Sequence, residues 1–355
     1  MKPKLAVVVA PNWRDYAEKY LANCLTGLTK QTFKEFKIFL IDNASQKQSL
    51  NFLKNSVEKY CPNHSYQIIA NVANDGFAKA NNEAIKEALE QNFDYIFLLN
   101  MDTIIADSCL QELLEVAKAE PGAGAIQARL MMWPDKNKIN SLGNVTHFLG
   151  FGYCRAYQEI FNHDLGIKNI CYPSGAGVLL KAEALLAVGL FDEEFWMYGE
   201  DQDLGWRLWL ADWPCLLAPQ AVVYHKYEFS RSIKKYFWID RNRILVILKN
   251  YRWPTLILIF PAFCLMELGL FYFAFKNGWL KEKLKIYKYF LSRRTWLYIF
   301  KARRQVQKLR TNKDAKLIEM FSGQILYQEI DSPILRMANL FFGLYWWLAK
   351  IFILW

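Results

Sequence analysis

The 355-residue sequence predicts an α/β fold in which a mixed, mostly parallel sheet carries helices on both faces, followed by a helical C-terminal region. Three observations predict this fold. Short β-branched runs alternate with stretches of helical periodicity, polar residues follow the predicted strands, and apolar and basic stretches dominate the last third of the chain. We therefore expect an α/β domain over residues 1–251 and a helical region over residues 252–355.

The first part of the chain alternates between strands and helices. The predicted strands are Leu5–Ala10, Phe36–Ile41, Tyr66–Ala70 and Tyr95–Leu99, with helices over about 16–30, from 46 to about 60, and up to about 90. Such alternation gives parallel strands whose carboxyl ends share one edge of the sheet, where ligands gather. Asn and Asp often follow strands because they favour turns, so each residue alone is weak evidence of a ligand site. The evidence is that several of them share one edge of the sheet. These polar residues are Asn12, Asp42, Asn71, Asn100 and Asp102.

The middle of the chain is less regular. A helix over about 108–118 and a strand at Ala123–Arg129 precede a long stretch, Met132–Tyr172, with little periodicity and several glycines. A stretch of this length without clear elements predicts a binding loop or lid. A further strand follows Pro173–Gly177, and the last strand segments end at His225.

Three carboxylates, Glu200, Asp201 and Asp203, lie within four residues directly after Gly199 and ahead of an apolar helical pattern. Acidic residues suit the partial positive charge at a helix start, so simple capping is one interpretation. Capping requires one or two carboxylates, and a third adds like-charge repulsion. Proteins tolerate that repulsion where a carboxylate acts as a base or faces a cation. Both interpretations stay open at this point.

The net charge of +10 arises from one segment. Residues 276–316 hold 14 Lys and Arg against two acidic residues, and the remainder holds 30 basic and 32 acidic residues. The segment lacks a recognisable nucleic-acid module, so we expect no nucleic-acid partner. Seven scattered cysteines without a Cys-x-x-Cys pair argue against a disulfide framework or zinc site and for a reducing compartment. The N-terminus leads directly into a strand and is not expected to be a signal peptide.

Two apolar stretches, Leu256–Phe275 and Ala338–Trp355, flank this basic segment. Each has the length of a membrane-spanning helix, but a crossing would place the basic segment outside, against the positive-inside tendency. We expect helices that lie in the cytoplasmic leaflet, with the basic segment on anionic headgroups. Burial in the protein's own core or in a homo-oligomer interface is the alternative. Upstream, Arg241 and Arg243 are expected on a solvated helix face, with phosphate contact as the alternative.

The polar residues at the sheet edge suit a nucleotide-sugar site. Asp42 offers an acceptor to a pyrimidine ring, and Asp102 offers carboxylate oxygens to a divalent cation that neutralises a diphosphate. His225 would add an imidazole, which suits Mn²⁺ better than Mg²⁺, although a structural histidine is the common alternative. Asp201 would act as a general base on an acceptor hydroxyl.

Six segments occur in the order expected of one family. They are Ile41–Ser45, Asn74–Asn82, Leu98–Thr103, Ser174–Gly177, Gly199–Leu204 and Tyr224–His225. With these segments the sequence resembles the family 2 glycosyltransferases, inverting enzymes of the GT-A (Rossmann-like) fold, and within them the rhamnosyltransferase-like branch. The resemblance covers roughly Leu5 to Tyr251 and makes residues 1–251 the expected catalytic domain.

The resemblance implies roles for individual residues. Asp42 matches the base-binding aspartate, Asp201 the catalytic base with Glu200 beside it, and Asp102 the last acid of the metal-binding Asp-x-Asp motif. Asn100 replaces the first acid of that motif, so Asp102, His225 and the diphosphate would hold the cation. Asp203 returns to the role of a first-turn carboxylate. The nucleotide-sugar-binding set comprises Pro11, Asn12, Asp42, Asn74, Gly76, Asn81, Asn100, Asp102 and Gly175.

The implied reaction moves a sugar from a UDP- or dTDP-linked donor, with rhamnose as one candidate, to a hydroxyl of a lipid-linked or cell-surface polysaccharide acceptor, with Mn²⁺ or Mg²⁺. Two alternatives remain. A sugar-nucleotide nucleotidyltransferase should carry a Gly-rich phosphate loop after the first strand, which Val9–Arg14 lacks. A non-catalytic membrane scaffold would be indicated by loss of Asp201 or Asp102, and both are present.

Overall fold

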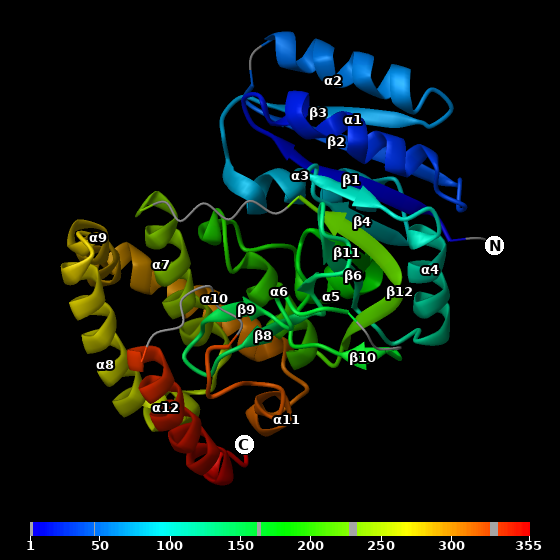
Figure 1. Ribbon diagram of the computed structural model, residues 1–355. Helices are drawn as coiled ribbons and strands as arrows, with labels where there is room; N and C mark the ends of the chain where they lie inside the picture. The colour runs from blue at the N-terminus through cyan, green and yellow to red at the C-terminus, as the bar shows by residue number, and fades with distance from the viewer. Residues whose placement is uncertain (1–2, 46, 162–164, 227–232, 327–332) are drawn as a thin grey trace.

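The structure is a computed structural model that describes residues 3–45, 47–161, 165–226, 233–326 and 333–355 (Figure 1). Its main sheet contains β1 Leu5–Asn12, β2 Phe36–Asn43, β3 Tyr66–Asn71, β4 Tyr95–Leu99, β5 Thr103–Ile105, β6 Ala125–Met132, β7 Ile139–Ser141, β10 Lys168–Asn169, β11 Gly177–Lys181 and β12 Cys215–His225. The strand order is β10-β12-β6-β11-β4-β1-β2-β3, with β5 on β12 and β7 on β6.

The sheet is mixed and mostly parallel, as predicted. Strand β1 runs parallel to both β2 and β4, and β2 runs parallel to β3. Strands β6 and β12 are parallel to each other, and β11 lies antiparallel between β4 and β6. The central strands are short apolar runs buried on both faces, which is typical of parallel sheets covered by helices.

Helices cover both faces of the sheet (Figure 1). On one face lie α1 Tyr16–Thr29, α2 Lys47–Tyr60 and α4 Cys109–Ala119. There Leu21 and Leu25 share a core with Val7 and Val9. On the other face lie α3 Gly76–Glu90, α5 Ala182–Val188, the 3₁₀ turn η1 Glu193–Phe195, α6 Glu200–Leu210 and α7 Ile233–Asn250. The two apolar clusters are therefore separated by the sheet itself.

The expectation that Met132–Tyr172 lacks clear elements was wrong, while its role as a binding loop stays a prediction. The stretch contains β7, β10 and a separate hairpin of β8 Asn144–Thr146 and β9 Gly152–Cys154. Phe148 in the hairpin turn is fully buried. Gly150 adopts φ 88°, and a Cβ there would lie 2.4 Å from the carbonyl oxygen of Arg243, so the turn packs tightly on α7. Strands of three residues are too short to show a period.

The C-terminal helices pack onto the same core as α6 and α7. They are α8 Trp253–Lys276, α9 Leu280–Leu291, α10 Arg293–Leu309, α11 Asp314–Ile318 and α12 Pro333–Phe352. The Trp206 ring of α6 lies edge-on against Phe321, with centroids 4.6 Å apart. The hairpin's Phe148 stacks on Trp346 of α12 at 4.7 Å. Apolar packing thus continues across residue 251, and a domain boundary there stays a prediction.

Several of these helices expose large apolar side chains, among them α8 and α12, which lie at the edge of the molecule away from β3 (Figure 1). Helix α8 is the one helix in the described part of the chain that is long and apolar enough to cross a membrane, by length and composition only. It exposes 69% of Leu268 and 65% of Phe275, and α12 exposes 72% of Leu340. Tyr345 of α12 donates a hydrogen bond to the Leu258 carbonyl of α8, so the two helices are in contact.

Candidate active site

The ends of β1 and β2 bring Asn12 and Asp42 together, as predicted. The two residues are partners in the strand register. Asn12 Nδ2 donates to Asp42 Oδ1 at 2.9 Å and to Ser49 Oγ at 2.7 Å, while the Ser45 N–H donates to Asp42 Oδ2 at 3.2 Å. Asp42 is only 2% exposed, so internal donors hold its carboxylate in place. Pro11 precedes Asn12 within β1 at the same edge.

The next strand ends are joined by Asn43, which sequence reasoning missed. Its Nδ2 donates to Asn74 Oδ1 at 2.8 Å, and its Oδ1 accepts from Asn71 Nδ2 at 3.2 Å. The Gly76 N–H donates to the same Asn74 oxygen. Gly76 adopts φ 79°, and a Cβ there would lie 2.5 Å from the Trp196 carbonyl oxygen. Glycine is therefore required for this close approach.

The start of α3 connects the predicted donor residues to the acidic stretch. The Trp196 carbonyl accepts from the Phe77 N–H at 2.8 Å. A Cβ on Gly175 would lie 3.1 Å from the Phe77 ring, so this loop also approaches α3 closely. Asn81 donates to the Phe77 carbonyl, and its buried Oδ1 has no hydrogen-bond partner among the described residues. Residues from three separate segments meet at Phe77.

Asp102 and His225 lie side by side because β5 pairs with the end of β12. His225 Nε2 is 3.2 Å from Asp102 Oδ1, and His225 Nδ1 is 3.1 Å from Asn140 Oδ1. Burial raises the pKa of Asp102, but the hydrogen bond and charge of His225, with the Tyr16 hydroxyl, outweigh burial and lower the pKa overall. Asn140 orients the imidazole, and its position in an aperiodic stretch gave no signal in the sequence.

These residues fit a divalent cation that is completed by a ligand. Carboxylate and imidazole suit Mn²⁺, and Asp102 and His225 supply one of each. The neighbouring Asn100 Oδ1 is buried and has no hydrogen-bond partner in the described segments, so it is a further oxygen at this edge. Within those segments no cluster of three or more His, Cys, Asp or Glu side chains suited to a metal occurs. A cation here would need oxygens from a bound diphosphate to fill its coordination sphere.

The acidic stretch starts α6 with Glu200 and Asp201 after Gly199, which adopts φ 85°. Burial raises the pKa of Asp201 to about 6, although hydrogen bonds from the Gln202 and Gly175 N–H groups oppose the rise. Burial, then the charge of Asp201, raises the pKa of Glu200 to about 8. Burial of two adjacent carboxylates therefore keeps both pKa values above their ordinary range, and the two groups titrate as a pair.

One loop links this acidic pair to the sheet edge. Gly175 donates its N–H to Asp201, and the carbonyl of the next residue, Ala176, accepts from the Asn100 N–H at 3.1 Å. The hairpin contacts the same turn of α6, because Gln202 Nε2 donates to Thr146 Oγ1 at 3.2 Å. Burial and then the Asp201 charge raise the pKa of Tyr172 and of Cys154, which ends β9. The start of α6 thus contacts both the Gly175 loop and the hairpin.

Asp203 is more than the first-turn carboxylate that the sequence suggested, because it is fully buried. It forms ion pairs with Arg207 and Lys249, each at 2.9 Å, and accepts from Asn250 Nδ2 at 3.0 Å. Burial raises its pKa, but the charges of Lys249 and Arg207 outweigh burial and hold the pKa at about 2. Asp203 therefore ties α6 to α7.

The turn before the acidic pair is held by α7. Asn242 Nδ2 donates to the Phe195 and Met197 carbonyls, each at 2.9 Å, and to the Tyr198 carbonyl. Within this turn Trp196 and Tyr198 adopt φ of 60° and 67°. Such left-handed backbone persists only where surrounding contacts hold it. We call residues 195–199 the pre-acidic turn, and Asn242 is a second residue that sequence reasoning missed.

The expectation that Arg241 and Arg243 lie on a solvated face was wrong. They are 4% and 3% exposed. Arg241 donates to the Glu194 and Phe195 carbonyls, and Arg243 pairs with Asp240 at 2.8 Å. Helices α9 and α10 cover α7, so a second helical layer lies where water was expected.

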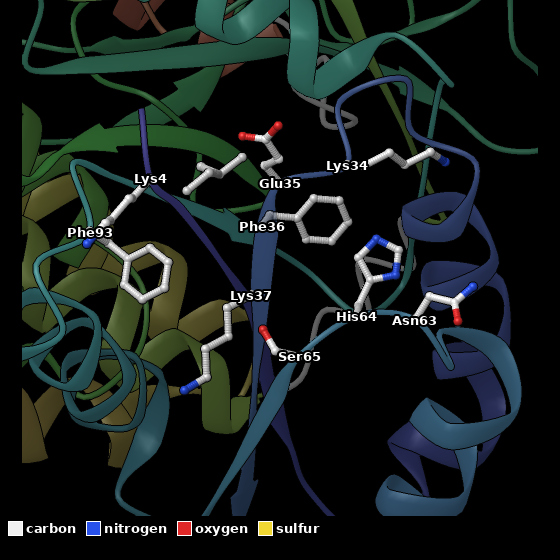
Figure 2. A pocket seen from close by; sticks show the side chains of 10 residues that line it. Lys4, Lys34, Glu35, Phe36, Lys37, Asn63, His64, Ser65 and Phe93 are labelled. Carbon is white, nitrogen blue, oxygen red and sulfur yellow. The ribbon is translucent and has the colours of Figure 1, made fainter. Parts of the chain in front are cut away.

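A cavity of about 460 Å³ lies at the opposite edge of the sheet (Figure 2). Its lining residues Lys4, Lys34 and Ser65 lie just before β1, β2 and β3. His64 stacks on Phe36 in this cavity at 4.5 Å, and Lys37 is held by Gln67 and Gln91. Because it opens at the amino ends of the strands, this cavity takes no part in the candidate site.

Comparisons with known proteins agree with this architecture. The family described as "Glycosyltransferase like family 2" matches residues 3–243. An N-acetylglucosaminyl-diphospho-decaprenol L-rhamnosyltransferase of Mycobacterium tuberculosis is 28% identical over 243 residues, covering 63% of this chain and 75% of its own length. A poly-beta-1,6-N-acetyl-D-glucosamine synthase of Staphylococcus epidermidis is 24% identical over 200 residues, covering 56% of this chain and 45% of its own. The matched region thus spans less than half of that synthase.

A solved structure gives the same fold. The mannosyltransferase PcManGT from Pyrobaculum calidifontis, in complex with GDP-Man and Mn²⁺, superimposes with a TM-score of 0.51 at 13% identity, covering 99% of this chain and 87% of that chain. The family match extends over more than half of the sequence, from the first strand into α7. The chain therefore belongs to the family 2 glycosyltransferases and has the GT-A fold.

Proposed function

We propose that this glycosyltransferase inverts the anomeric centre of a UDP- or dTDP-linked sugar as it moves the sugar to a hydroxyl of a lipid-linked or cell-surface polysaccharide acceptor. Mn²⁺ or Mg²⁺ assists, and the reaction takes place at the cytoplasmic face of the cell membrane. Asp201 removes the proton from the acceptor hydroxyl, and Glu200 lies beside it as an acceptor-side partner. The oxygen then attacks the anomeric carbon opposite the nucleotide diphosphate, which leaves.

The observation that carries this proposal is the state of the acidic pair. A general base works best when its pKa is near the working pH, and burial raises the pKa of Asp201 to about 6. Burial and the Asp201 charge also raise the pKa of Glu200, to about 8. The Gly175 N–H fixes the Asp201 carboxylate from the loop that also bonds Asn100. A carboxylate needed only for helix capping would not require this environment.

The strand-end residues support the donor side. The Asp42 carboxylate is an acceptor suited to the N–H of a pyrimidine base, and Asn12 orients it. Asp102 and His225 would ligate the cation, which neutralises charge on the departing diphosphate. The Pyrobaculum calidifontis mannosyltransferase was solved with GDP-Man and Mn²⁺, which supports a divalent cation in this fold. The nucleotidyltransferase and scaffold alternatives are disfavoured by the family match.

The proposed acceptor and location are supported by the names of relatives and by the surface of the C-terminal helices. The mycobacterial relative is named for a diphospho-decaprenol substrate, and the staphylococcal relative for a polysaccharide product. The exposed apolar side chains of α8 and α12 suit the acyl region of a bilayer. The basic 276–316 segment favours the leaflet with anionic lipids, and seven free cysteines favour a reducing compartment.

The substitution Asp201→Asn tests the proposal. We expect kcat to fall by about 10²–10⁴-fold, the usual contribution of a general base, while calorimetry shows donor binding unchanged. The matched control is Asp212→Asn, since Asp212 lies just past α6 and is 61% exposed. The donor comes from a panel of UDP-, dTDP- and GDP-sugars, and NMR of the product reads its anomeric configuration. Near-wild-type turnover in Asp201→Asn would exclude Asp201 as the base, and retained configuration would exclude inversion.

A further inference from the structure

An apolar groove of about 490 Å³ lies between α7, α8, α9 and α10. Its floor contains Ile244, Ile247 and Ile259, which are at most 6% exposed. Its mouth is formed by Ile257 and Phe260 of α8, which are 72% and 59% exposed. The volume lies within the range of small-molecule sites. The lining offers hydrocarbon and aromatic surface throughout, apart from one end.

That end holds Glu267, whose charge is compensated within the protein. Its carboxylate pairs with Arg243 and, at 2.8 Å, with Lys283, and accepts from the Tyr287 hydroxyl at 3.1 Å. Asp240 completes the network by pairing with both cations. A carboxylate matched in this way offers little to a polar ligand. The groove therefore suits a hydrocarbon chain.

Cationic residues lie close in the sequence to the groove lining. Phe290 of α9 and Trp296 of α10 both line the groove, and between them in the chain lie the exposed Arg293 and Arg294, the first two residues of α10. Helix α10 begins at Arg293, so its partial positive end lies at the same place. An occupant that matches both features combines a hydrocarbon chain with an anionic head.

We propose that the groove binds one acyl chain of an anionic bilayer phospholipid, with Arg293 and Arg294 on its phosphate. This site rests on the proposed membrane location and extends it from a surface to a defined lipid position. The mouth is continuous with the exposed face of α8, where Leu265 and Leu268 are 47% and 69% exposed. Two of the floor residues, Ile244 and Ile247, belong to α7, which also carries Asn242. A bound lipid would thus fix the height and tilt of the helix that holds the pre-acidic turn.

The test uses the full-length protein on phosphatidylcholine vesicles that contain about 30% phosphatidylglycerol, which makes the surface anionic. The phosphatidylglycerol carries a photoreactive diazirine on its acyl chain. After photolysis, mass spectrometry maps the crosslinked peptides. Wild-type protein should crosslink mainly at α8 and at residues 244–248. Ile257→Glu should lower the crosslinks at 244–248 at least about tenfold, because it places a charge in the groove mouth. Leu268→Glu is the matched control, with the same charge on the same exposed helix face outside the groove.

A second pair of variants tests the head group. The double change Arg293→Gln and Arg294→Gln should reduce groove crosslinking by the anionic lipid more than crosslinking by a diazirine phosphatidylcholine, whose phosphate charge is offset by choline. Lys301→Gln, another exposed cation on α10 outside the groove lining, is its control.

Several outcomes would overturn the assignment. Equal loss at 244–248 in Ile257→Glu and Leu268→Glu would mean that α8 offers only a general apolar surface. Displacement of the phospholipid by an equal amount of polyprenyl phosphate would assign the groove to an acceptor-like lipid instead. Crosslinks between two protein copies through α8 would assign it to self-association. Flotation of the protein with vesicles measures membrane binding separately, and donor turnover in detergent measures transferase activity. A failure of the proposed lipid site is therefore distinguishable from a failure of the proposed membrane location or activity.

Discussion

Replacing Glu200 by glutamine is expected to stabilise the folded protein while it impairs catalysis. Burial, together with the Asp201 charge, raises the pKa of Glu200 from its ordinary 4.5 to about 8. At pH 7 the unfolded chain has an ionised Glu200, whereas the folded chain must hold a proton there. Glutamine is neutral in both states and of similar shape, so this cost is removed.

The magnitude follows from the pKa difference. One pKa unit corresponds to about 1.4 kcal/mol, so at pH 7 the folded state bears a cost of up to about 3 kcal/mol. An unfolding entropy of about 2.1 cal/mol/K per residue gives roughly 0.7 kcal/mol/K for this chain, so Tm should rise by about 4 °C. Because the folded pKa lies above the unfolded one, the wild-type protein loses stability relative to the variant as pH rises from about 4.5 to about 8.

The assay is thermal unfolding of both detergent-purified proteins at pH 4.5, 6, 7 and 8. The Tm difference should be near zero at pH 4.5 and largest at pH 8. Glu183→Gln is the control, because the Glu183 side chain is 68% exposed and its loss should change Tm little at any pH. A lower Tm for Glu200→Gln at pH 7, or a difference that does not change with pH, would refute the reasoning.

Four further substitutions test other contacts. Asn242→Ala should lower kcat about 10–100-fold with donor affinity unchanged, because the pre-acidic turn loses its support; weaker donor binding in calorimetry would contradict this. Asp203→Asn should lower the free energy of unfolding in urea by about 3–5 kcal/mol at pH 7, since the buried Lys249 loses a partner, and a loss below 1 kcal/mol would contradict the assigned role. His225→Ala should raise the Mn²⁺ concentration for half-maximal activity about 10–100-fold, with Asn140→Ala acting in the same direction; unchanged metal dependence would remove His225 from the cation site.

The sheet edge was predictable from the sequence because its geometry follows from strand order. Parallel strands end on one side, so Asn12 and Asp42 had to become neighbours once both strands were identified. Asp102 and His225 are far apart in the chain, and the short β5 strand brings them to 3.2 Å. Each of these residues follows or ends a strand, which is a local signal.

Asn242 and Asn140 have no local signal of this kind in the sequence. Asn242 reaches the pre-acidic turn from a helix more than forty positions later, and Asn140 reaches His225 from a stretch whose strands are three residues long. Arg241 and Arg243 resembled a solvated face because charge periodicity does not reveal a second layer of helices. Such contacts depend on tertiary packing, which local patterns do not encode.

Because Phe148 stacks on Trp346, the C-terminal helices cannot be replaced without affecting the hairpin. Helix α12 supports the hairpin that contacts Gln202 at the start of α6, and the same helix exposes apolar side chains proposed to meet the membrane. The hairpin and the exposed apolar helix are therefore packed directly on each other. If the proposed acceptor site and membrane contact are correct, exchanging the C-terminal helices for those of a relative is expected to change acceptor use and membrane binding together.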